Sequence, residues 1–494
     1  QLRNVARDWL SDGVYILEVH PFPQLQASTG QVDRSKLPDV AAPPEPKFPT
    51  IATTTLSNGL KVYLAERSTV PLVNFNLMVD AGYAADHQGV LGTASLAMNM
   101  MDEGTRTRTA IQISDALQRL GAQLGTGSNV DMSNVSLSTL KENMDSSLAV
   151  FADVVLNPSF PQQDFDRLMK LQLAQIQREK ATPVQMALRV FPLLLYGSGH
   201  AYGIPLTGSG TEESGSRLRR DNLIEFHRTW FKPNNASLIV VGATTLAEIT
   251  PKLERLFGSW RPGDVPKKNI GQVAQQPRSA VYLIDRPGSE QSIIFAGHVA
   301  PPKRNPREIA LLTMNDILGG SFTSRVNMNL REGKHWSYGA FSLLFDARGQ
   351  RPFIVYAPVQ TDKTKESLTE VVNELRGITQ SRPVTAQGLA KAQANLTLSL
   401  PGQWETIGAL GGSVEEIVRF DLPHDYYTTF ASKVRELQVA DLSTAAKETI
   451  QPDKLVWVVV GDRAKIEPGI RELNLGPLQF LDADGKPIRE TAVP

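Results

Sequence analysis

The stretch Gly92-Thr93-Ala94-Ser95-Leu96-Ala97-Met98-Asn99-Met100-Met101-Asp102-Glu103-Gly104-Thr105 decides how this 494-residue chain is interpreted. Its pattern predicts a helix over residues 93–101, with a glycine on either side. Ser95 and Asn99 lie one helical turn apart and share a face of that helix. The helix offers the hydroxyl of Ser95, the thioether of Met98 and the carboxamide of Asn99. These groups are poor ligands for zinc, which proteins hold with imidazole, thiolate or carboxylate groups. We therefore expect no zinc on this helix.

A helix, a turn and an apolar strand recur in that order about 220 residues apart. One copy places a helix at residues 221–228 and a strand at residues 236–242, and the other places them at residues 441–447 and 455–461. Pro-Asn and Pro-Asp dipeptides end the helices, and the Val- and Ile-rich runs that follow are typical of buried strands. Repetition over this distance indicates duplicated domains rather than a solenoid, whose repeats are roughly 20–50 residues long.

A shorter version of the same element stands at the N-terminus. Residues 5–10 suggest a helix and residues 14–19 an apolar strand, which together would be the last helix and strand of a preceding unit. The alternative is an unrelated, β-rich extension, and the pattern alone leaves both open. If residues 1–23 do belong to a preceding unit, their strand must pair with a sheet elsewhere, because an unpaired edge invites aggregation.

These signals predict six segments and an α+β fold made of two homologous α/β sandwich units. Residues 24–49 are Pro-rich and are expected to form an extended linker. The first unit spans residues 50–260 and opens with a hairpin around Asn58-Gly59, followed by a strand at residues 72–79 and a long amphipathic helix at residues 165–180. A linker covers residues 261–279, the second unit residues 280–468, and a short polar tail residues 469–494.

From residue 50 onward the chain resembles the pitrilysin/insulinase superfamily of zinc peptidases, which includes the mitochondrial processing peptidase. The run Asn315-Asp316-Ile317-Leu318-Gly319-Gly320-Ser321-Phe322-Thr323-Ser324-Arg325, followed by Leu330-Arg331-Glu332, is similar to that family's signature. Further matches, weak singly but specific in their order, are Gly82, Gly92, Gly104-Thr105, Tyr202-Gly203, Pro233-Asn234 and Pro287-Gly288. The resemblance implies two units that form one half of a clamshell peptidase, whose other half is a similar pair.

The resemblance also shows what this chain lacks. The family carries the inverted zincin motif H-x-x-E-H on its metal-site helix. In this sequence Ser95 and Asn99 occupy the two histidine positions, and Met98 occupies that of the catalytic glutamate. Gln175 stands where the family places the glutamate that is the third zinc ligand, upstream of Pro183. All four functional positions are therefore substituted, and the resemblance implies a degenerate zinc site.

One functional pair of the family is retained in the second unit. Arg331 and Tyr338, seven residues apart before a predicted strand, are similar to the family's Arg/Tyr pair. In the family this pair reaches across the chamber to the zinc site of the opposite half and contacts the substrate carbonyl. A permanent cation and a neutral phenol donor suit a developing oxyanion. The alternative is a surface arginine and a core tyrosine at the start of a strand.

Composition narrows the remaining possibilities. Fifty-one basic and 51 acidic residues balance, which gives no sign of a nucleic-acid or anionic-membrane partner. No apolar run approaches the roughly 18 residues of a transmembrane helix, and the absence of cysteine excludes disulfides and thiolate metal sites. A cysteine-free chain suits an oxidising compartment such as the bacterial periplasm, which is the expected location, although this composition does not demand one. The seven histidines, which show no ligand-like spacing, are His20, His87, His200, His227, His298, His335 and His424.

The resemblance, with its substituted zinc positions, implies the non-catalytic half of a zinc metallopeptidase. The chain itself would carry no cofactor, while a partner half, either a separate subunit or an upstream part of the same precursor, would hold zinc. The substrates that the resemblance implies are peptides or unfolded proteins that bind in the chamber as an added strand. The competing hypothesis is a structural scaffold or binding subunit of the same fold without a catalytic role. Retention of Arg331 and Tyr338 favours the first.

Overall fold

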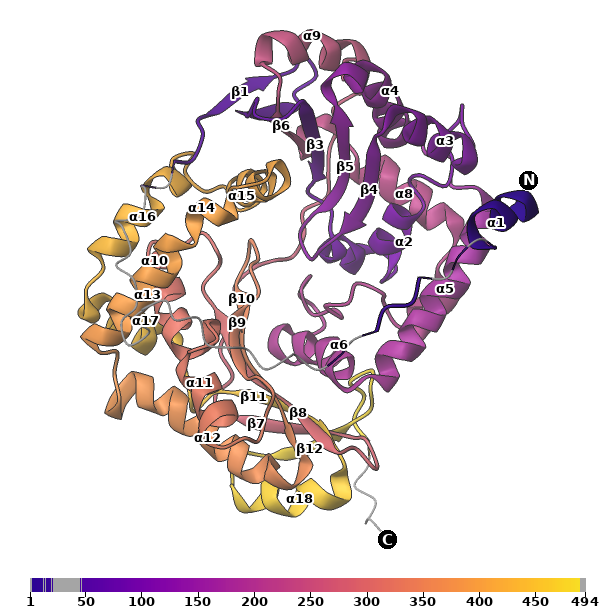
Figure 1. The fold of residues 1–494 in the computed structure, drawn as a ribbon. Coiled ribbons are helices and arrows are strands. Elements are labelled where there is room, and N and C mark those ends of the chain that lie inside the picture. Colours follow the sequence, from indigo (N-terminus) through magenta and orange to yellow (C-terminus); the bar gives the residue numbers. More distant parts are fainter. Residues whose placement is uncertain are drawn as a thin grey trace. The chain divides into compact units, whose positions relative to one another are not determined.

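The computed structural model describes residues 2–11, 13, 15–18, 20, 45 and 47–488. It divides into an N-terminal part, Gln1–Glu45, and a body, Pro46–Pro494, and each is described by itself. The body contains two six-stranded sheets with helices packed on their faces (Figure 1). This mixed architecture confirms the predicted α+β class.

The first sheet has the strand order β1-β2-β6-β3-β5-β4. Its strands are β1 (Ile51–Thr55), β2 (Lys61–Glu66), β3 (Leu72–Val79), β4 (Gln123–Ser128), β5 (Ser133–Leu140) and β6 (Ala236–Gly242). The predicted hairpin is present, with Gly59 in the left-handed region (φ 92°) between antiparallel β1 and β2. Strand β6 runs parallel to β2 and antiparallel to β3, so the last strand of the unit lies near the centre of its sheet.

The second sheet repeats this arrangement in the order β12-β7-β11-β8-β10-β9. Its strands are β7 (Ala280–Asp285), β8 (Gln291–Ala300), β9 (Phe341–Leu344), β10 (Arg351–Gln360), β11 (Val456–Gly461) and β12 (Leu478–Leu481). Strand β11 is inserted between β7 and β8 just as β6 is inserted between β2 and β3. The two copies of the recurring helix-turn-strand element therefore occupy equivalent places in two equivalent sheets.

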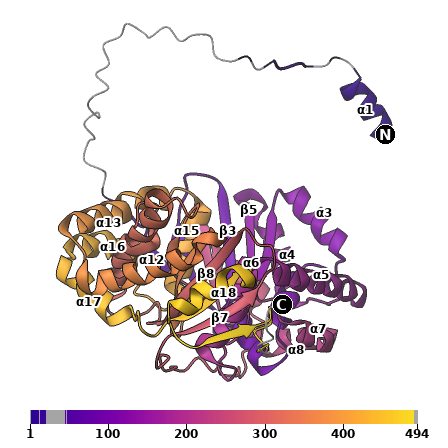
Figure 2. The ribbon, with the colours of Figure 1, turned by 90° about the horizontal axis from the view of Figure 1, so that it is seen from below.

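Helices cover one face of each sheet and bury its apolar residues. The first sheet carries α2 (Thr93–Asn99), α3 (Ala110–Leu120), α4 (Met144–Leu156), α8 (Arg220–Trp230) and α9 (Leu246–Phe257). The second carries α10 (Glu308–Asn315), α12 (Thr364–Arg376), α17 (Val439–Thr449) and α18 (Arg463–Glu472). The helices α13 (Ala386–Leu398), α16 (Tyr426–Glu436) and α17 gather at one end of the body, with α3 and α5 (Gln162–Ala181) at the other (Figure 2).

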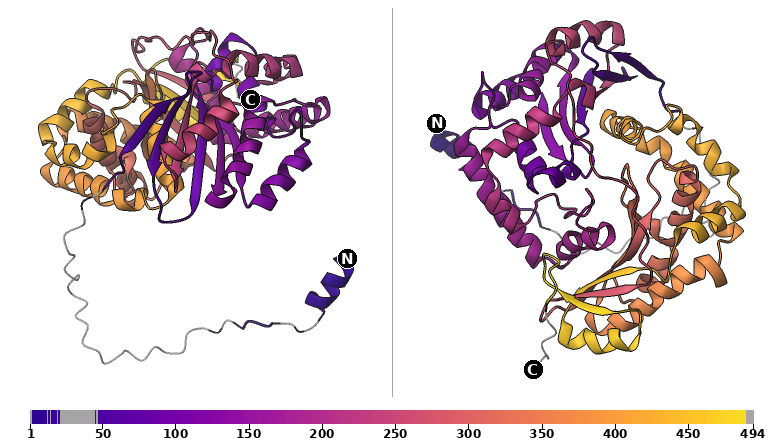
Figure 3. Two further views of the ribbon diagram at one scale, coloured as in Figure 1. Left: turned by 90° about the horizontal axis from the view of Figure 1, so that it is seen from above. Right: turned by 180° about the vertical axis from the view of Figure 1, so that it is seen from behind.

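Each unit also places one helix on the opposite face of the other unit's sheet. Helix α6 (Pro183–Tyr196), from the first unit, packs on β8 and β11 of the second sheet, where Phe191 meets Phe295 at a ring-centroid distance of 5.9 Å. Helix α15 (Ile407–Arg419), from the second unit, packs on β6, β3 and β2 of the first sheet through Leu410 and Val414. The two units of the body, seen together in Figure 3, are joined by these exchanged helices.

The C-terminal segment differs from the prediction of a polar tail over residues 469–494. Helix α18 continues to Glu472, and β12 adds a parallel edge strand to β7. Farther on, Asp484 accepts hydrogen bonds from Lys180 at 2.8 Å and Arg189 at 2.9 Å. Burial alone would raise the pKa of Asp484, but these two cations hold it below its usual value. The segment up to residue 488 is therefore part of the folded body.

The N-terminal part contains the helix that the sequence predicts there, α1 (Leu2–Leu10), whose Leu2 and Trp9 are exposed. The predicted strand over residues 14–19 is not formed at residues 15–18, and Val14 and Val19 lie outside the described residues. Most of the predicted linker at residues 24–49 also lies outside them. Among the described helices, none has the length and apolar character needed to cross a membrane.

Candidate functional site

The degenerate metal-site helix, α2, is anchored at its N-terminus by a buried carboxylate. Gly92 adopts a left-handed conformation (φ 93°), and its N–H donates to Asp86 at 2.8 Å, while the N–H of Ala94 donates to the other carboxylate oxygen at 2.9 Å. Burial raises the pKa of Asp86 to about 8, although the backbone hydrogen bonds oppose that rise. A side chain at Gly92 would meet Gln172 and the Ser209 backbone, so this turn requires glycine.

The four positions that correspond to zinc-site residues face different surroundings. Ser95 Oγ donates to the carbonyl oxygen of Gly208 at 2.8 Å, and Met98 is fully buried in the core of the first unit. Asn99 is exposed. Gln175 is exposed on α5, where it donates to Glu179 at 3.2 Å and accepts from Arg178. No hydrogen bond joins any two of these four side chains in the described part of the chain.

This donor set does not suit a metal ion. A hydroxyl already used by a carbonyl, a buried thioether and two carboxamides provide neither imidazole nor carboxylate. Across the described residues, no group of three or more His, Cys, Asp or Glu side chains is placed to hold a metal. We therefore derive no metal chemistry for this helix.

Helix α5 reaches α2 through residues that the sequence analysis did not select. Gln172 is buried and donates to the carbonyl oxygens of Gly92 at 3.3 Å and Ser209 at 2.9 Å. One and two turns farther along, Ile176 and Glu179 continue the buried stripe, and Glu179 pairs with buried Arg189 at 2.8 Å. The helical spacing from Phe165 through Gln172 to Ile176 is the sequence signal that could have identified this face.

Arg331 lies on a short π-helical segment, η5 (Met328–Gly333), in the second unit. Its guanidinium stacks over the ring of Phe322 at 4.5 Å from the centroid, within reach of a cation–π interaction. Its Nε also lies 3.2 Å from the carboxylate of Glu332, and the side chain is 36% exposed. Arg331 is therefore oriented by a ring on one side and remains accessible.

Tyr338 projects from a loop that is held firmly on both sides. Ser337 Oγ donates to the carbonyl oxygen of Pro358 at 2.6 Å and accepts from the N–H of Gly339 at 3.1 Å. Buried Asn327 accepts from the N–H of Ala340 at 3.0 Å. Tyr338 itself is 86% exposed, and its hydroxyl makes no hydrogen bond within the described residues. The alternative of a core tyrosine at the start of β9 therefore does not hold.

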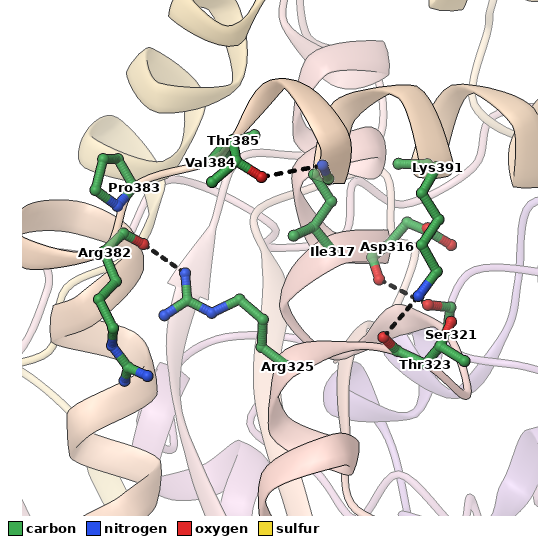
Figure 4. A pocket seen from close by; sticks show the side chains of 12 residues that line it. Asp316, Ile317, Ser321, Thr323, Arg325, Arg382, Pro383, Val384, Thr385 and Lys391 are labelled. Carbon is green, nitrogen blue, oxygen red and sulfur yellow. Dashed lines mark hydrogen bonds between the residues drawn. The ribbon is translucent and has the colours of Figure 1, made fainter.

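A cavity of about 310 Å³ lies beside the loop that carries Phe322 and is lined by its neighbours Ser321 and Thr323. The loop follows the π-helical segment η4 (Asp316–Gly320), and such segments are frequent at functional sites. Figure 4 shows Lys391 reaching from α13 to the carbonyl oxygen of Thr323 at 3.1 Å, and Arg325 reaching that of Arg382 at 2.6 Å. Asn327 also donates to the carbonyl oxygen of Phe322 at 2.6 Å, which links this loop to that of Tyr338.

Comparison with known proteins places this geometry in a family. The family model described as the insulinase family (peptidase family M16) matches residues 61–192, and the one described as the peptidase M16 inactive domain matches residues 217–396. An uncharacterized zinc protease of Mycobacterium leprae is 24% identical over 363 residues, which cover 72% of this chain and 80% of the relative. A probable mitochondrial-processing peptidase subunit beta of Arabidopsis thaliana is 24% identical and is covered over 53% of its length.

Solved structures show the same fold. A peptidase M16 inactive domain from Pseudomonas fluorescens superposes with a TM-score of 0.78 at 24% identity, covering 83% of this chain and 97% of that one. A protease from Helicobacter pylori gives a TM-score of 0.77 at 18% identity, covering 84% of this chain and all of that one. With the zinc-site positions substituted and two M16-type units in place, this chain belongs to the M16 (pitrilysin/insulinase) peptidase family as a half without the H-x-x-E-H motif.

Proposed function

We propose that this chain is the non-catalytic half of a zinc metallopeptidase. It forms part of the wall of a substrate chamber and supplies Arg331 and Tyr338 to a zinc site in a partner half, which hydrolyses peptides or unfolded proteins. The observation that carries the proposal is the exposure of Tyr338 on a loop that Ser337 fixes by a hydrogen bond. The same unit also carries Arg331, which is accessible and stacks on the ring of Phe322. A solvated phenol without a partner among the described residues has no evident structural role, but it is available to a ligand.

The two side chains suit the stabilisation of an oxyanion. When water attacks a peptide carbonyl, negative charge develops on its oxygen, and preorganised donors lower the barrier to that step. The guanidinium of Arg331 carries a permanent positive charge, and the hydroxyl of Tyr338 donates one hydrogen bond. The partner half would supply zinc, which activates the attacking water, together with its ligands and the general base.

The N-terminal part fits a role in that partner half. In the body, α17 leads into β11, which is the third of six strands and is paired on both sides. If α1 and residues 14–19 are the equivalent elements of a preceding unit, the strand completes the interior of the partner's sheet. Leu2, Val5 and Trp9, exposed on α1, would then be covered by that unit.

The absence of cysteine supports the bacterial periplasm as the compartment.

The test is peptide cleavage by the chain assembled with a partner that carries H-x-x-E-H. Arg331→Ala should lower the turnover about 10²–10³-fold, the usual effect of losing one oxyanion donor, with the zinc content of the complex unchanged. Tyr338→Phe should lower it equally or less, and the double substitution should be less than additive, since both groups act on one oxygen.

Melting temperature and complex formation, measured on the same variants, separate this role from a structural one. Neither should change, because both side chains are accessible. A stably assembled Arg331→Ala complex with full activity would contradict the proposal and leave the scaffold function in its place.

A further inference from the structure

A cavity of about 340 Å³ lies between α15 and the first sheet, away from Arg331 and the degenerate zinc helix. Its floor consists of two rungs of the sheet, each of which is a row of paired residues on the neighbouring strands β4, β5, β3 and β6. One consists of Gln123, Ser138, Asn74 and Val241, and the next of Gly125, Ser136, Asn76 and Ile239. Because side chains two positions apart share a face of a strand, both rungs point toward α15. Each rung is apolar on β6 and polar from β3 outward.

Helix α15 covers only the apolar end of these rungs. Leu410 and Val414 pack against Ile239 and Val241. The helix presents glycine at two positions that line the cavity, and a Cβ built on Gly408 would meet no atom within 4 Å. At the opposite end Gln123, Gly125 and Ser136 are exposed. The polar half of the floor is therefore open, while an apolar wall continues beneath the helix.

Two buried acceptors on β3 face the cavity without a donor. The side-chain oxygens of Asn74 and Asn76 are buried, and no described residue gives either of them a hydrogen bond. The amide of Asn76 donates to Glu415 on α15, which fixes its oxygen as the unpaired end. Glu415 is the one charged residue that lines the cavity. Two carbonyl oxygens without a donor, and a carboxylate with a single amide donor, therefore line the same cavity, and buried acceptors without a partner are costly.

The negative charge of Glu415 is only partly compensated by its surroundings. Burial raises the pKa of Glu415, and the nearest cation, Arg419 one turn along α15, opposes that rise. Arg419, however, is already engaged elsewhere, since its Nη2 lies 3.5 Å from Asp131 and its guanidinium stacks on Phe420 at 4.7 Å. A ligand cation that reaches the cavity would therefore meet an incompletely compensated carboxylate.

We propose that this cavity binds the basic side chain, Lys or Arg, of a peptide. The ammonium or guanidinium head would donate to Glu415, Asn74 and Asn76, while the aliphatic stem would lie along Ile239 and Val241, as long basic side chains do on mixed surfaces. The inference rests on the proposed function only in taking a substrate peptide as the source of that side chain. It gives the chamber wall a preference for basic residues that is separate from the oxyanion pair.

The test is binding of short fluorescent peptides to the full chain without any partner half, followed by fluorescence anisotropy. Two peptides of alternating Ala and Thr differ at one central position, which is Lys in one and norleucine in the other. Hydrogen bonds to a charged group should make the Lys peptide bind roughly 10- to 100-fold more tightly. Replacement of that Lys by Glu should weaken binding below that of the norleucine peptide.

Three variants assign the preference to the cavity. Glu415→Gln should bring the Lys and norleucine affinities together, whereas Glu405→Gln, which removes an exposed carboxylate just before α15, should leave the preference intact. Gly408→Leu should fill the cavity and abolish the preference without lowering the melting temperature, because the position is open and leucine favours a helix over glycine.

Equal affinity for the two peptides, no measurable binding of the Lys peptide, or a preference that survives both Glu415→Gln and Gly408→Leu would overturn the inference. These outcomes are independent of turnover. If Arg331→Ala is fully active in the assembled enzyme but the chain still prefers Lys, the oxyanion role fails and the cavity stands. The converse result would retain the oxyanion role and reject the cavity.

Discussion

Phe322 determines how Arg331 is presented. The ion pair of Arg331 with Glu332 joins two partly exposed neighbours, so it adds little orientation, and the ring at 4.5 Å is the principal support. Phe322→Leu should remove a stabilisation of about 0.5–1 kcal/mol and reduce turnover of the assembled enzyme several-fold, less than Arg331→Ala does. The measurement is kcat on the same peptide substrate.

Matched variants show whether Phe322 acts through Arg331. Phe322→Trp should restore most of the activity, since indole also offers a ring face to a cation. In the Arg331→Ala background, Phe322→Leu should have no further effect. The melting temperature should stay constant because Phe322 is 55% exposed. An equal loss of activity in both backgrounds would show that Phe322 acts independently of Arg331.

The substituted zinc positions give a prediction for the chain alone. After mild chelation and dialysis against zinc, the purified protein should retain no stoichiometric metal at Ser95, Met98, Asn99 and Gln175, because none of them offers an imidazole or a carboxylate. Elemental analysis by mass spectrometry measures this directly. Tightly held zinc that is lost on Ser95→Ala or Asn99→Ala would refute the degenerate site.

At the residue scale, the sequence selects candidate residues but does not specify the contacts that their side chains make. Arg331 and Tyr338 could be selected because the Gly319–Arg325 run fixes their register, but the exposure of Tyr338 depends on Ser337 and Asn327, which bond to distant backbone. Gln175 was selected by its distance along the chain, whereas Gln172 donates a hydrogen bond to Gly92 at the start of α2. Contacts of this kind depend on how two helices are rotated against each other, which spacing alone does not specify.

At the element scale, the exchanged helices hold the two units together. Phe191 on α6 is fully buried against the second sheet, so Phe191→Ala should remove packing at the boundary between the units and destabilise the body by about 3–5 kcal/mol. Chemical denaturation followed by tryptophan fluorescence measures the loss. Leu171→Ala on exposed α5 surface is the control and should change stability by less than about 0.5 kcal/mol.

Strands with strong apolar patterns were predicted well, and short or exchanged elements were not. Strand β3 occupies the predicted residues 72–79, because alternation and β-branched residues define it locally. Strand β12 has only four residues among polar ones, and it forms because β7 offers an edge to which it can pair. The placement of α6 and α15 on the opposite unit's sheet likewise depends on which apolar surface is left uncovered.

At the scale of the whole molecule, the duplication was visible in the sequence, because both copies of the helix-turn-strand element end in an apolar strand that must be buried. Strands β6 and β11 meet this requirement in the same way, by insertion between two others. The cavity under α15 could not be predicted, because it arises where a helix of one unit covers only part of the other unit's sheet.

The stability of the folded body should decline in acid because of a buried histidine that must stay neutral. His298 Nε2 accepts from the N–H of Gln451 at 3.2 Å while Nδ1 donates to the carbonyl oxygen of Val299 at 3.0 Å, so protonation of Nε2 would break the first bond. Burial lowers the pKa of His298 from 6.5 to about 4. Between these values the unfolded state binds the extra proton, so stability is full above pH 6.5 and falls by about 3 kcal/mol as the pH drops to about 4. Urea denaturation across this range should show the fall. His298→Gln should make the slope shallower but not flat, because burial also lowers the pKa of His227 to about 4, and the variant should be less stable at neutral pH. His424→Gln, at an exposed position, should leave the slope unchanged, and an unaltered slope in His298→Gln would assign the acid sensitivity to other groups.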